Sequence, residues 1–268
     1  MKKLEHLSEI YNQYDTFIID LWGVMHNGLT LNKKAMEVVK NLKKNSKKIV
    51  FLSNAPRPKT KVINFLLKMK MNKDYLSNVV TSGEAAMNAL NKQEFGKKFY
   101  HLGPPRDTSI FEDVKDNRID IENCDFILCT GFLDGYENDL DFYKKLLTKH
   151  TSKKLVCTNP DLTVHRGNKE EYCAGYIAKI FESIGGKVIY YGKPYKEIYK
   201  MCFEENEKVL AIGDNLRTDI KGANNINKDC LFISSGVHRY EFNDNKDLND
   251  LLNKYKVRAN YFQNELQW

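Results

Sequence analysis

The chain has 268 residues, of which 42% are hydrophobic and 29% are charged, and its formal net charge is +7. This size and composition suit a soluble globular protein with a core domain and a second domain, and no apolar run approaches the roughly 20 residues of a membrane helix. The N-terminal stretch MKKLEHLSEI lacks the apolar core of a signal peptide, and the six scattered cysteines form no C-x-x-C pair. We therefore expect a cytoplasmic protein with reduced cysteines and no membrane partner.

The positive charge is spread along the whole chain and is mixed with Asn and Glu, as in KKNSKK and NKDLND. Nucleic-acid sites instead cluster basic residues in a stripe with interleaved aromatic residues. We therefore predict no nucleic-acid partner. A mild positive field of this kind suits a small anionic substrate.

Short apolar runs, each followed by Gly, Asn, Asp or Ser, predict buried strands. In chain order they are FIID (17–20), KIVFLS (48–53), FILCTG (126–131), KLVCTN (154–159), KVIYYG (187–192), KVLAIGD (208–214) and CLFISSG (230–236). Helical patterns lie between them at KTKVINFLLKMK (59–70), EEYCAGYIAKIFESI (170–184) and YKEIYKMCFEEN (195–206), whereas two adjacent prolines predict a loop at LGPPRD (102–107). This alternation predicts an α/β protein with a doubly wound, mainly parallel sheet.

Ligands of open parallel sheets bind beyond the carboxyl ends of the strands. The polar residues predicted at this edge are Asp20, Ser53, Asn54, Asn159, Asp161, Lys193 and Asp214. Their convergence is a stronger indication of a site than any single motif.

The carboxylates Asp20, Asp214 and Asp219 suit a magnesium site. Mg²⁺ prefers one or two carboxylates, waters and substrate phosphate oxygens. An aspartate at a strand end can also act as a nucleophile that accepts a phosphoryl group. The alternatives are a turn or N-cap role for Asp20, and a favourable place near a helix N-terminus for Asp219.

Ser53 and Asn54 follow a strand, where a hydroxyl and backbone N–H groups can hold a phosphate. Lys193 lies between Gly192 and Pro194, just before a predicted helix, and can neutralise phosphate charge. The alternatives are a serine turn before the prolines and a surface lysine. Glycine-rich nucleotide loops are absent from the sequence, and the cysteines and histidines do not cluster at zinc spacing.

The ordered set FIIDLWGV, FLSN, GKP and GDNLRTD resembles the four motifs of the haloacid dehalogenase-like (HAD) superfamily. The insert of about a hundred residues between the second and third motifs resembles the α/β cap of subfamily IIA, which includes the NagD-like phosphatases. TNPD at 158–161, AGYIAKI at 174–180 and SSGV at 234–237 support this likeness, which covers essentially the whole chain.

The resemblance implies a Rossmann-like core over 1–72 and 189–268, with an inserted α/β cap over 73–188 that closes over the site and selects the substrate. Asp20 would be the nucleophile that forms an aspartyl-phosphate, while Ser53, Asn54 and Lys193 hold the phosphoryl group. Asp20, Asp214 and the backbone carbonyl of Trp22 would bind Mg²⁺, with Asp219 assisting. Asn159, Asp161 and His165 would line the substrate pocket. Related proteins often pair through their caps, so the resemblance also suggests a homodimer.

The sequence departs from the family pattern at Trp22. The usual first motif is D-x-D, and its second aspartate protonates the leaving oxygen and then activates water. Losing such a group typically costs 10²–10⁴-fold in rate. His26, six residues after Asp20, is an alternative acid or a packing residue.

Three functions therefore remain open. The first is a Mg²⁺-dependent phosphatase acting on a small phosphorylated metabolite of the nucleotide or sugar phosphate class. The second is a phospho-ligand binding or regulatory protein that is catalytically weak or inactive. The third is hydrolysis of a carbon–halogen or carbon–phosphorus bond, and Asp214 argues against the halide version.

Overall fold

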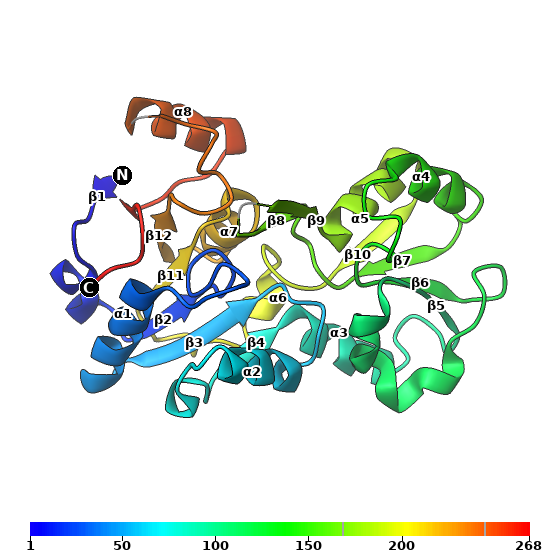
Figure 1. Cartoon of the computed structure of the whole chain (residues 1–268), viewed down its shortest axis with the longest axis horizontal. Coiled ribbons are helices and arrows are strands. Elements are labelled where there is room, and N and C mark those ends of the chain that lie inside the picture. Colours follow the sequence, from blue (N-terminus) through cyan, green and yellow to red (C-terminus); the bar gives the residue numbers. More distant parts are fainter. Residues whose placement is uncertain (168, 244) are drawn as a thin grey trace.

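In the computed structural model, which describes residues 1–167, 169–243 and 245–268, the chain forms two lobes, each built around a parallel β-sheet (Figure 1). The larger sheet has seven strands in the order β1-β13-β12-β11-β2-β3-β4. Their bounds are β1 (Lys2–Lys3), β13 (Tyr261–Gln263), β12 (Asp229–Ile233), β11 (Val209–Gly213), β2 (Thr16–Ile19), β3 (Lys48–Ser53) and β4 (Val79–Thr81). Every neighbouring pair is parallel, which confirms the predicted α/β class.

Helices cover both faces of this sheet. One face packs against α1 (Lys33–Lys44) and α2 (Lys59–Lys68), and the other against α6 (Lys196–Tyr199), η5 (Leu216–Ile220), α7 (Lys221–Asn225) and α8 (Asn245–Tyr255). The strands are buried on both faces because their side chains alternate between the two cores. In β2, for example, Phe17 and Ile19 join the α1 side, whereas Ile18 joins the α6 side. Short turns of 3₁₀ helix complete this lobe at η1 (Leu7–Glu9), η2 (Tyr11–Gln13) and η3 (Lys73–Tyr75).

The smaller lobe has a four-stranded parallel sheet in the order β10-β7-β6-β5. Its strands are β10 (Lys187–Tyr190), β7 (Lys154–Cys157), β6 (Phe126–Cys129) and β5 (Phe99–Leu102). One face packs against α4 (Leu140–Thr148) and α5 (Ala174–Ser183), and the other against α3 (Ser82–Asn91) and η4 (Pro105–Asn117). The six cysteines of the chain are all buried and none forms a disulfide.

An antiparallel hairpin, β8 (Thr163–Arg166) and β9 (Lys169–Tyr172), lies between the two lobes (Figure 1). At its turn, the Gly167 N–H donates a hydrogen bond of 3.0 Å to the Asn27 carbonyl of the larger lobe. The hairpin therefore bridges from the smaller sheet to the loop that follows β2.

The strands of the two sheets give bounds for a core and a cap that differ from the predicted bounds at both ends. We predicted a cap over 73–188. However, residues 79–81 form β4 at the edge of the larger sheet, and β10 of the smaller sheet continues to Tyr190. We therefore propose a cap over about residues 82–190 and a core made of the rest.

All seven predicted strands are present, and α2 lies where predicted. The helix predicted over 170–184 begins only at Ala174, because the residues before Cys173 belong to β9. The helix predicted over 195–206 is limited to the four residues of α6. The loop predicted at 102–107 was partly wrong, because Pro105 starts η4 at a first position where no N–H is needed.

None of the helices among the described residues has the length and apolar character needed to cross a membrane.

Candidate active site

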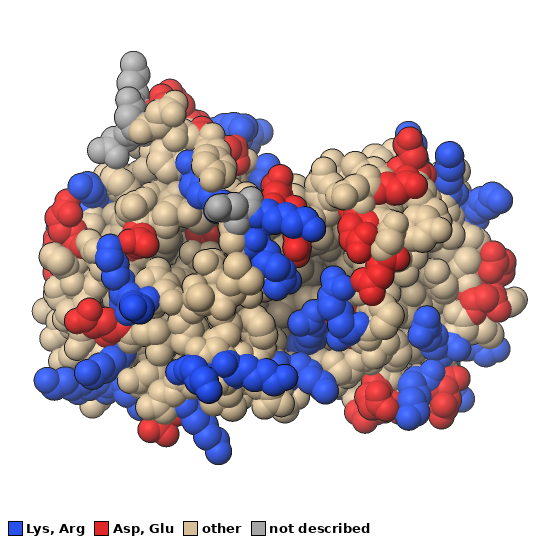
Figure 2. All heavy atoms as spheres, in the orientation of Figure 1, with Lys and Arg blue, Asp and Glu red and all other residues tan. Residues whose placement is uncertain are grey.

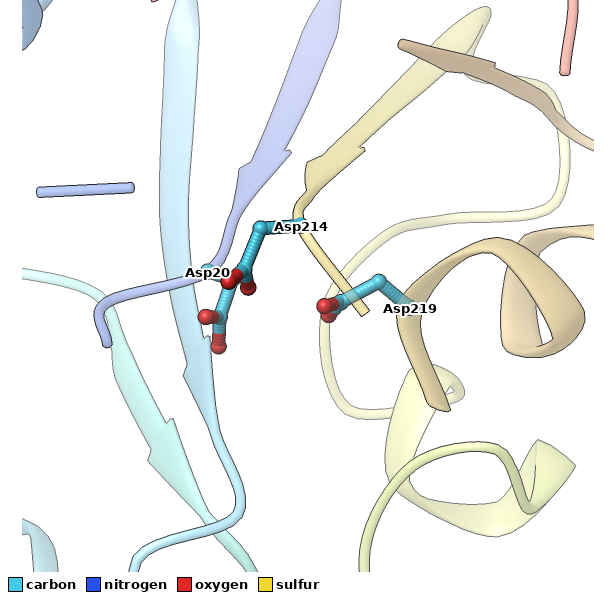
Figure 3. A group of neighbouring side chains, drawn as sticks. All are labelled: Asp20, Asp214 and Asp219. Carbon is cyan, nitrogen blue, oxygen red and sulfur yellow. The ribbon is translucent and has the colours of Figure 1, made fainter. Parts of the chain in front are cut away.

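Three buried carboxylates gather at the carboxyl edge of the larger sheet (Figure 3). Asp20 follows β2 and Asp214 follows the neighbouring strand β11, while Asp219 lies in η5 shortly after. One oxygen from each carboxylate lies within 4.8 Å of the other two. Glycine is required beside Asp214, since an added Cβ at Gly23 or Gly236 would lie 2.1 or 2.0 Å from its Oδ2. The sequence prediction that these acids share one point is therefore consistent with the structure.

Lys193 connects two of these carboxylates. Its Nζ donates hydrogen bonds to Asp20, to Asp219 Oδ1 at 2.7 Å and to the Leu52 carbonyl at 3.0 Å. Its side chain is only 3% exposed, so the alternative of a surface lysine does not hold. The lysine reaches this position because the loop after β10 ends against the carboxyl edge of the larger sheet.

The charges of this cluster do not balance. Burial is the main cause that raises the pKa of Asp20 well above its ordinary value, although Lys193 opposes the shift. Burial and the nearby Asp219 raise the pKa of Asp214 to about 8. Burial alone would lower the pKa of Lys193, but the surrounding carboxylates raise it well above its ordinary value. A buried site with three carboxylates and one ammonium favours the binding of a further cation.

The side chains of Asn54 and Ser53 make different contacts. The Asn54 side chain holds the Lys193 backbone, because its Oδ1 accepts from the Lys193 N–H at 2.8 Å and its Nδ2 donates to the Lys193 carbonyl at 3.2 Å. The Ser53 hydroxyl oxygen accepts from the Ala55 N–H at 3.2 Å, which is the serine turn that the sequence allowed as an alternative. No described residue accepts a hydrogen bond from this hydroxyl, so its hydrogen is available to a ligand in the cavity that Ser53 lines.

Asn159 and Asp161 lie where the cap chain returns to the core. Asn159 Oδ1 accepts from the Asp161 N–H at 3.1 Å, which shapes the turn. Asp161 Oδ1 accepts from Thr218 Oγ1 at 3.0 Å and from Asn215 Nδ2 at 3.2 Å. Both predicted residues line the cavity, but Asp161 also joins the cap to the turn that carries Asp219.

Trp22 contacts the cap hairpin. Its Nε1–H donates to the His165 carbonyl at 2.9 Å, and the Arg166 guanidinium carbon lies 5.0 Å from the centroid of its ring. The His26 ring packs edge-on against the Trp22 ring, with ring centroids 5.1 Å apart, and His26 Nδ1 accepts a hydrogen bond from the Gly28 N–H at 3.0 Å. Burial lowers the pKa of His26 to about 4, so it is neutral at pH 7. These contacts favour a packing role for His26.

A cavity of about 730 Å³ extends from the carboxylate cluster to the hairpin. This volume is typical of sites for small molecules. All ten residues predicted for the site or its substrate pocket line it, namely Asp20, Trp22, Ser53, Asn54, Asn159, Asp161, His165, Lys193, Asp214 and Asp219.

Further lining residues were missed by sequence reasoning. Thr218, Asn215 and Arg239 all follow strands of the larger sheet, so the strand-end rule pointed to their segments. Arg57 and Asp107 form an ion pair of 2.5 Å between core and cap, for which the sequence carried no signal.

Comparisons with known proteins agree with this architecture. Residues 17–115 match the family profile described as haloacid dehalogenase-like hydrolase, and residues 190–262 match one described as HAD-hydrolase-like. The chain is 23% identical over 239 residues to the 5'-nucleotidase YutF of Bacillus subtilis, covering 85% of this chain and 90% of that protein. It is 30% identical over 162 residues to the ribonucleotide monophosphatase NagD of Escherichia coli, covering 59% of this chain and 62% of that protein.

The fold is shared with solved structures over nearly its whole length. A haloacid dehalogenase-like hydrolase from Brucella suis superposes with a TM-score of 0.86 at 26% identity, covering 98% of this chain and 99% of that chain. The residues matched by the two family profiles include Asp20, Ser53, Lys193 and Asp214. The chain therefore belongs to the haloacid dehalogenase-like hydrolases.

Proposed function

We propose that this protein is a Mg²⁺-dependent phosphatase that acts on a small phosphorylated metabolite through an aspartyl-phosphate on Asp20. The observation that carries the proposal is the buried cluster in which Lys193 links Asp20 and Asp219 beside Asp214, at the base of a cavity between core and cap. The relatives named as 5'-nucleotidase and ribonucleotide monophosphatase support it.

The cluster fits a hard cation such as Mg²⁺. Its donors are all oxygens, and among the described residues Asp20 Oδ2 and Asp214 Oδ1 accept no hydrogen bond. Asp219 is more fully engaged, because Oδ1 accepts from Lys193 and Oδ2 accepts from the Asn215 N–H at 3.0 Å. We propose that Asp20, Asp214 and the Trp22 carbonyl hold the ion, and that Asp219 mainly positions Lys193. The bound ion would neutralise charge on the phosphate oxygens.

Within this site each residue has a defined role in the proposed reaction. An Asp20 oxygen bonds to phosphorus while the bond from phosphorus to the ester oxygen breaks, and the ester oxygen leaves with the electron pair and takes a proton from water. Lys193 stabilises charge on the phosphoryl oxygens, and Ser53 donates a hydrogen bond to one of them. Water then attacks the aspartyl-phosphate, which releases phosphate and restores Asp20. Asn54 keeps Lys193 in place through its backbone.

The proposed reaction is tested by phosphate release from a panel of phosphate esters with Mg²⁺. We expect Asp20→Asn to abolish release, because an amide is not a nucleophile toward phosphorus. Full activity of this variant would contradict the aspartyl-phosphate. Tight Mg²⁺-dependent binding of a phosphate ester by calorimetry, without release, would instead support a binding protein.

The absence of an acid at position 22 makes a separate prediction. We expect the protein to favour aryl and acyl phosphates over alkyl phosphates, because good leaving groups need no proton. Trp22→Asp and Trp22→Asn remove the same contacts with the hairpin, and only the first supplies a carboxyl group. Turnover of alkyl phosphates should therefore be about 10²-fold or more higher in Trp22→Asp than in Trp22→Asn. Equal rates in these two variants would show that position 22 is not the limiting defect.

A further inference from the structure

The cationic side chains of the cavity differ in how their charge is compensated. Six of them line it, namely Arg57, Arg106, Arg166, Lys169, Lys193 and Arg239. Four of them form ion pairs. Arg57 pairs with Asp107, Arg106 with Asp134 at 2.9 Å and Arg166 with Glu171 at 3.3 Å. Lys193 pairs with Asp20 and Asp219. Within the part of the chain that the structure describes, Lys169 and Arg239 have no carboxylate at ion-pair distance. Figure 2 shows basic side chains gathered around the hollow between the two lobes.

Arg239 is the better placed of the two. Lys169 is exposed on β9, where its charge acts on Glu137 of the cap. Arg239 is half-buried, and an arginine keeps its charge at all accessible pH values. Its guanidinium carbon lies 4.7 Å from the centroid of the Tyr240 ring, which compensates the buried charge only in part.

The loop that carries Arg239 is held rigidly against the carboxylate cluster. The Val237 N–H donates to Asp214 Oδ2 at 2.8 Å, and the Arg239 N–H donates to the Gly236 carbonyl at 3.2 Å. Between them, His238 is 1% exposed and its Nε2 accepts from the Leu216 N–H at 3.1 Å. The backbone that carries Arg239 is therefore tied to the proposed metal site.

Arg239 also faces the cap hairpin. Burial is the largest cause that lowers the pKa of His165 in β8, and the positive charge of Arg239 is the second. The rings of His165 and Tyr240 lie 6.4 Å apart. Arg239 thus stands on the cavity wall between the carboxylate cluster and the hairpin, where the part of a substrate beyond its reacting phosphate would lie.

We propose that the substrate carries a second anionic group, a carboxylate or another phosphate, which the guanidinium of Arg239 binds. This inference rests on the proposed phosphatase function and specifies its substrate class. The planar guanidinium suits either anion, because it can donate two parallel hydrogen bonds to both. A substrate whose only charge is the reacting phosphate leaves this cation without a partner.

Two matched substrate pairs test the inference. Phosphoglycerate and glycerol phosphate differ by a carboxylate, and a hexose bisphosphate and a hexose phosphate differ by a second phosphate. We expect kcat/KM to favour the doubly anionic member of at least one pair by on the order of tenfold to a hundredfold, as for a hydrogen-bonded charge pair. The pair that shows the preference identifies the second group.

The ratio within each pair should depend on Arg239. We expect Arg239→Gln to bring it close to one and Arg239→Lys to restore part of it. Arg258→Gln removes the same charge from an exposed residue that does not line the cavity, and should leave the ratio as in the wild type. The inference is overturned if the wild type shows no preference in either pair, or if the preference survives in Arg239→Gln.

This outcome is separable from the proposed function. An aryl phosphate, which has one anionic group, reports phosphatase activity by itself. Turnover of the aryl phosphate without any preference within the pairs would overturn the second anion site alone. Failure of every ester, including the aryl phosphate, would overturn the phosphatase.

Discussion

At position 22 the chain carries a tryptophan where the motif resemblance leads us to expect a second aspartate. Trp22 keeps the backbone carbonyl that we propose as a metal ligand, and its side chain contacts the cap hairpin. It is held by the His165 carbonyl and by the Arg166 guanidinium, both in β8. An added Cβ at Gly28 would lie 2.6 Å from the Trp22 ring, so the loop after β2 is shaped around it. Trp22 therefore provides a contact between core and cap.

The hydrogen bond from Trp22 predicts how firmly the hairpin is held. Trp22→Phe keeps an aromatic ring beside Arg166 but removes the N–H donor. We expect a local loss of about 1 kcal/mol, which corresponds to roughly fivefold faster amide exchange in the hairpin. Hydrogen exchange followed by mass spectrometry over residues 163–172 measures this.

The other tryptophan offers the control. Trp268 packs against Tyr11 with ring centroids 4.9 Å apart, and neither ring lines the cavity. Trp268→Phe should leave exchange in the hairpin unchanged. Identical exchange in Trp22→Phe and the wild type would mean that the contact does not hold the hairpin.

At the scale of elements, the sequence predicts the central strands well and the edges poorly. Strands such as β2 and β11 are buried on both faces, so their apolar runs are visible without the structure. The hairpin β8–β9 is half-buried or exposed and rich in charge, so its pattern resembles a loop or a helix. β4 has three residues, and its place in the larger sheet depends on pairing with β3. The missed features are thus those determined by long-range contacts.

The same limit applies to the candidate site. The strand-end rule identified Asp20, Lys193 and Asp214, because a parallel sheet brings its carboxyl ends to one edge. It did not indicate that the Asn54 side chain would be used to hold Lys193, which lies 139 residues away. Nor did it indicate that Trp22 would reach His165, since that contact depends on how the cap sits over the core.

The smaller sheet contains a histidine whose burial predicts a pH effect on stability. His101 in β5 is 2% exposed, and its Nε2 lies 2.8 Å from Thr130 Oγ1. Burial, with a smaller contribution from Arg118, lowers the pKa of His101 from 6.5 to about 4. Between these values the unfolded chain binds a proton that the folded chain excludes. The contribution of neutral His101 is therefore complete above about pH 6.5 and is lost as the pH falls toward 4.

The variant His101→Gln lacks this titration. We expect the free energy of unfolding to fall less between about pH 7 and pH 5 in this variant than in the wild type, by about 2 kcal/mol. Urea unfolding at the two pH values measures the difference. His150→Gln, in the turn after α4, is the matched substitution and should behave as the wild type. A pH dependence unchanged by His101→Gln would show that folding does not lower the pKa of this histidine.

For the whole molecule, the cavity exists only while cap and core are joined. Two of the joining contacts are polar and lie around the cavity, namely the ion pair of Arg57 with Asp107 and the hydrogen bonds of Asp161 to Thr218 and Asn215. The carboxylates come from the core alone, whereas the cavity wall opposite them comes from the cap. We therefore expect metal binding to depend on the folded core alone, and substrate choice to depend on the cap joined to the core.

Binding of Mg²⁺ to the folded core predicts a change in thermal stability that needs no substrate. A ligand that binds only the folded chain at a hundredfold excess over its Kd stabilises it by about 2.7 kcal/mol, or roughly 5–10 °C in the Tm of a chain of this size. We expect this shift when Mg²⁺ is added to the wild type, and its reversal by a chelator. Asp214→Asn should fold, because burial already favours the neutral form of this side chain, but should lose the shift. Asp116→Asn makes the same substitution at an exposed cap residue and should keep the Tm shift. An equal shift in Asp214→Asn would mean that Mg²⁺ binds elsewhere, because the proposed site cannot lose this carboxylate and retain its affinity.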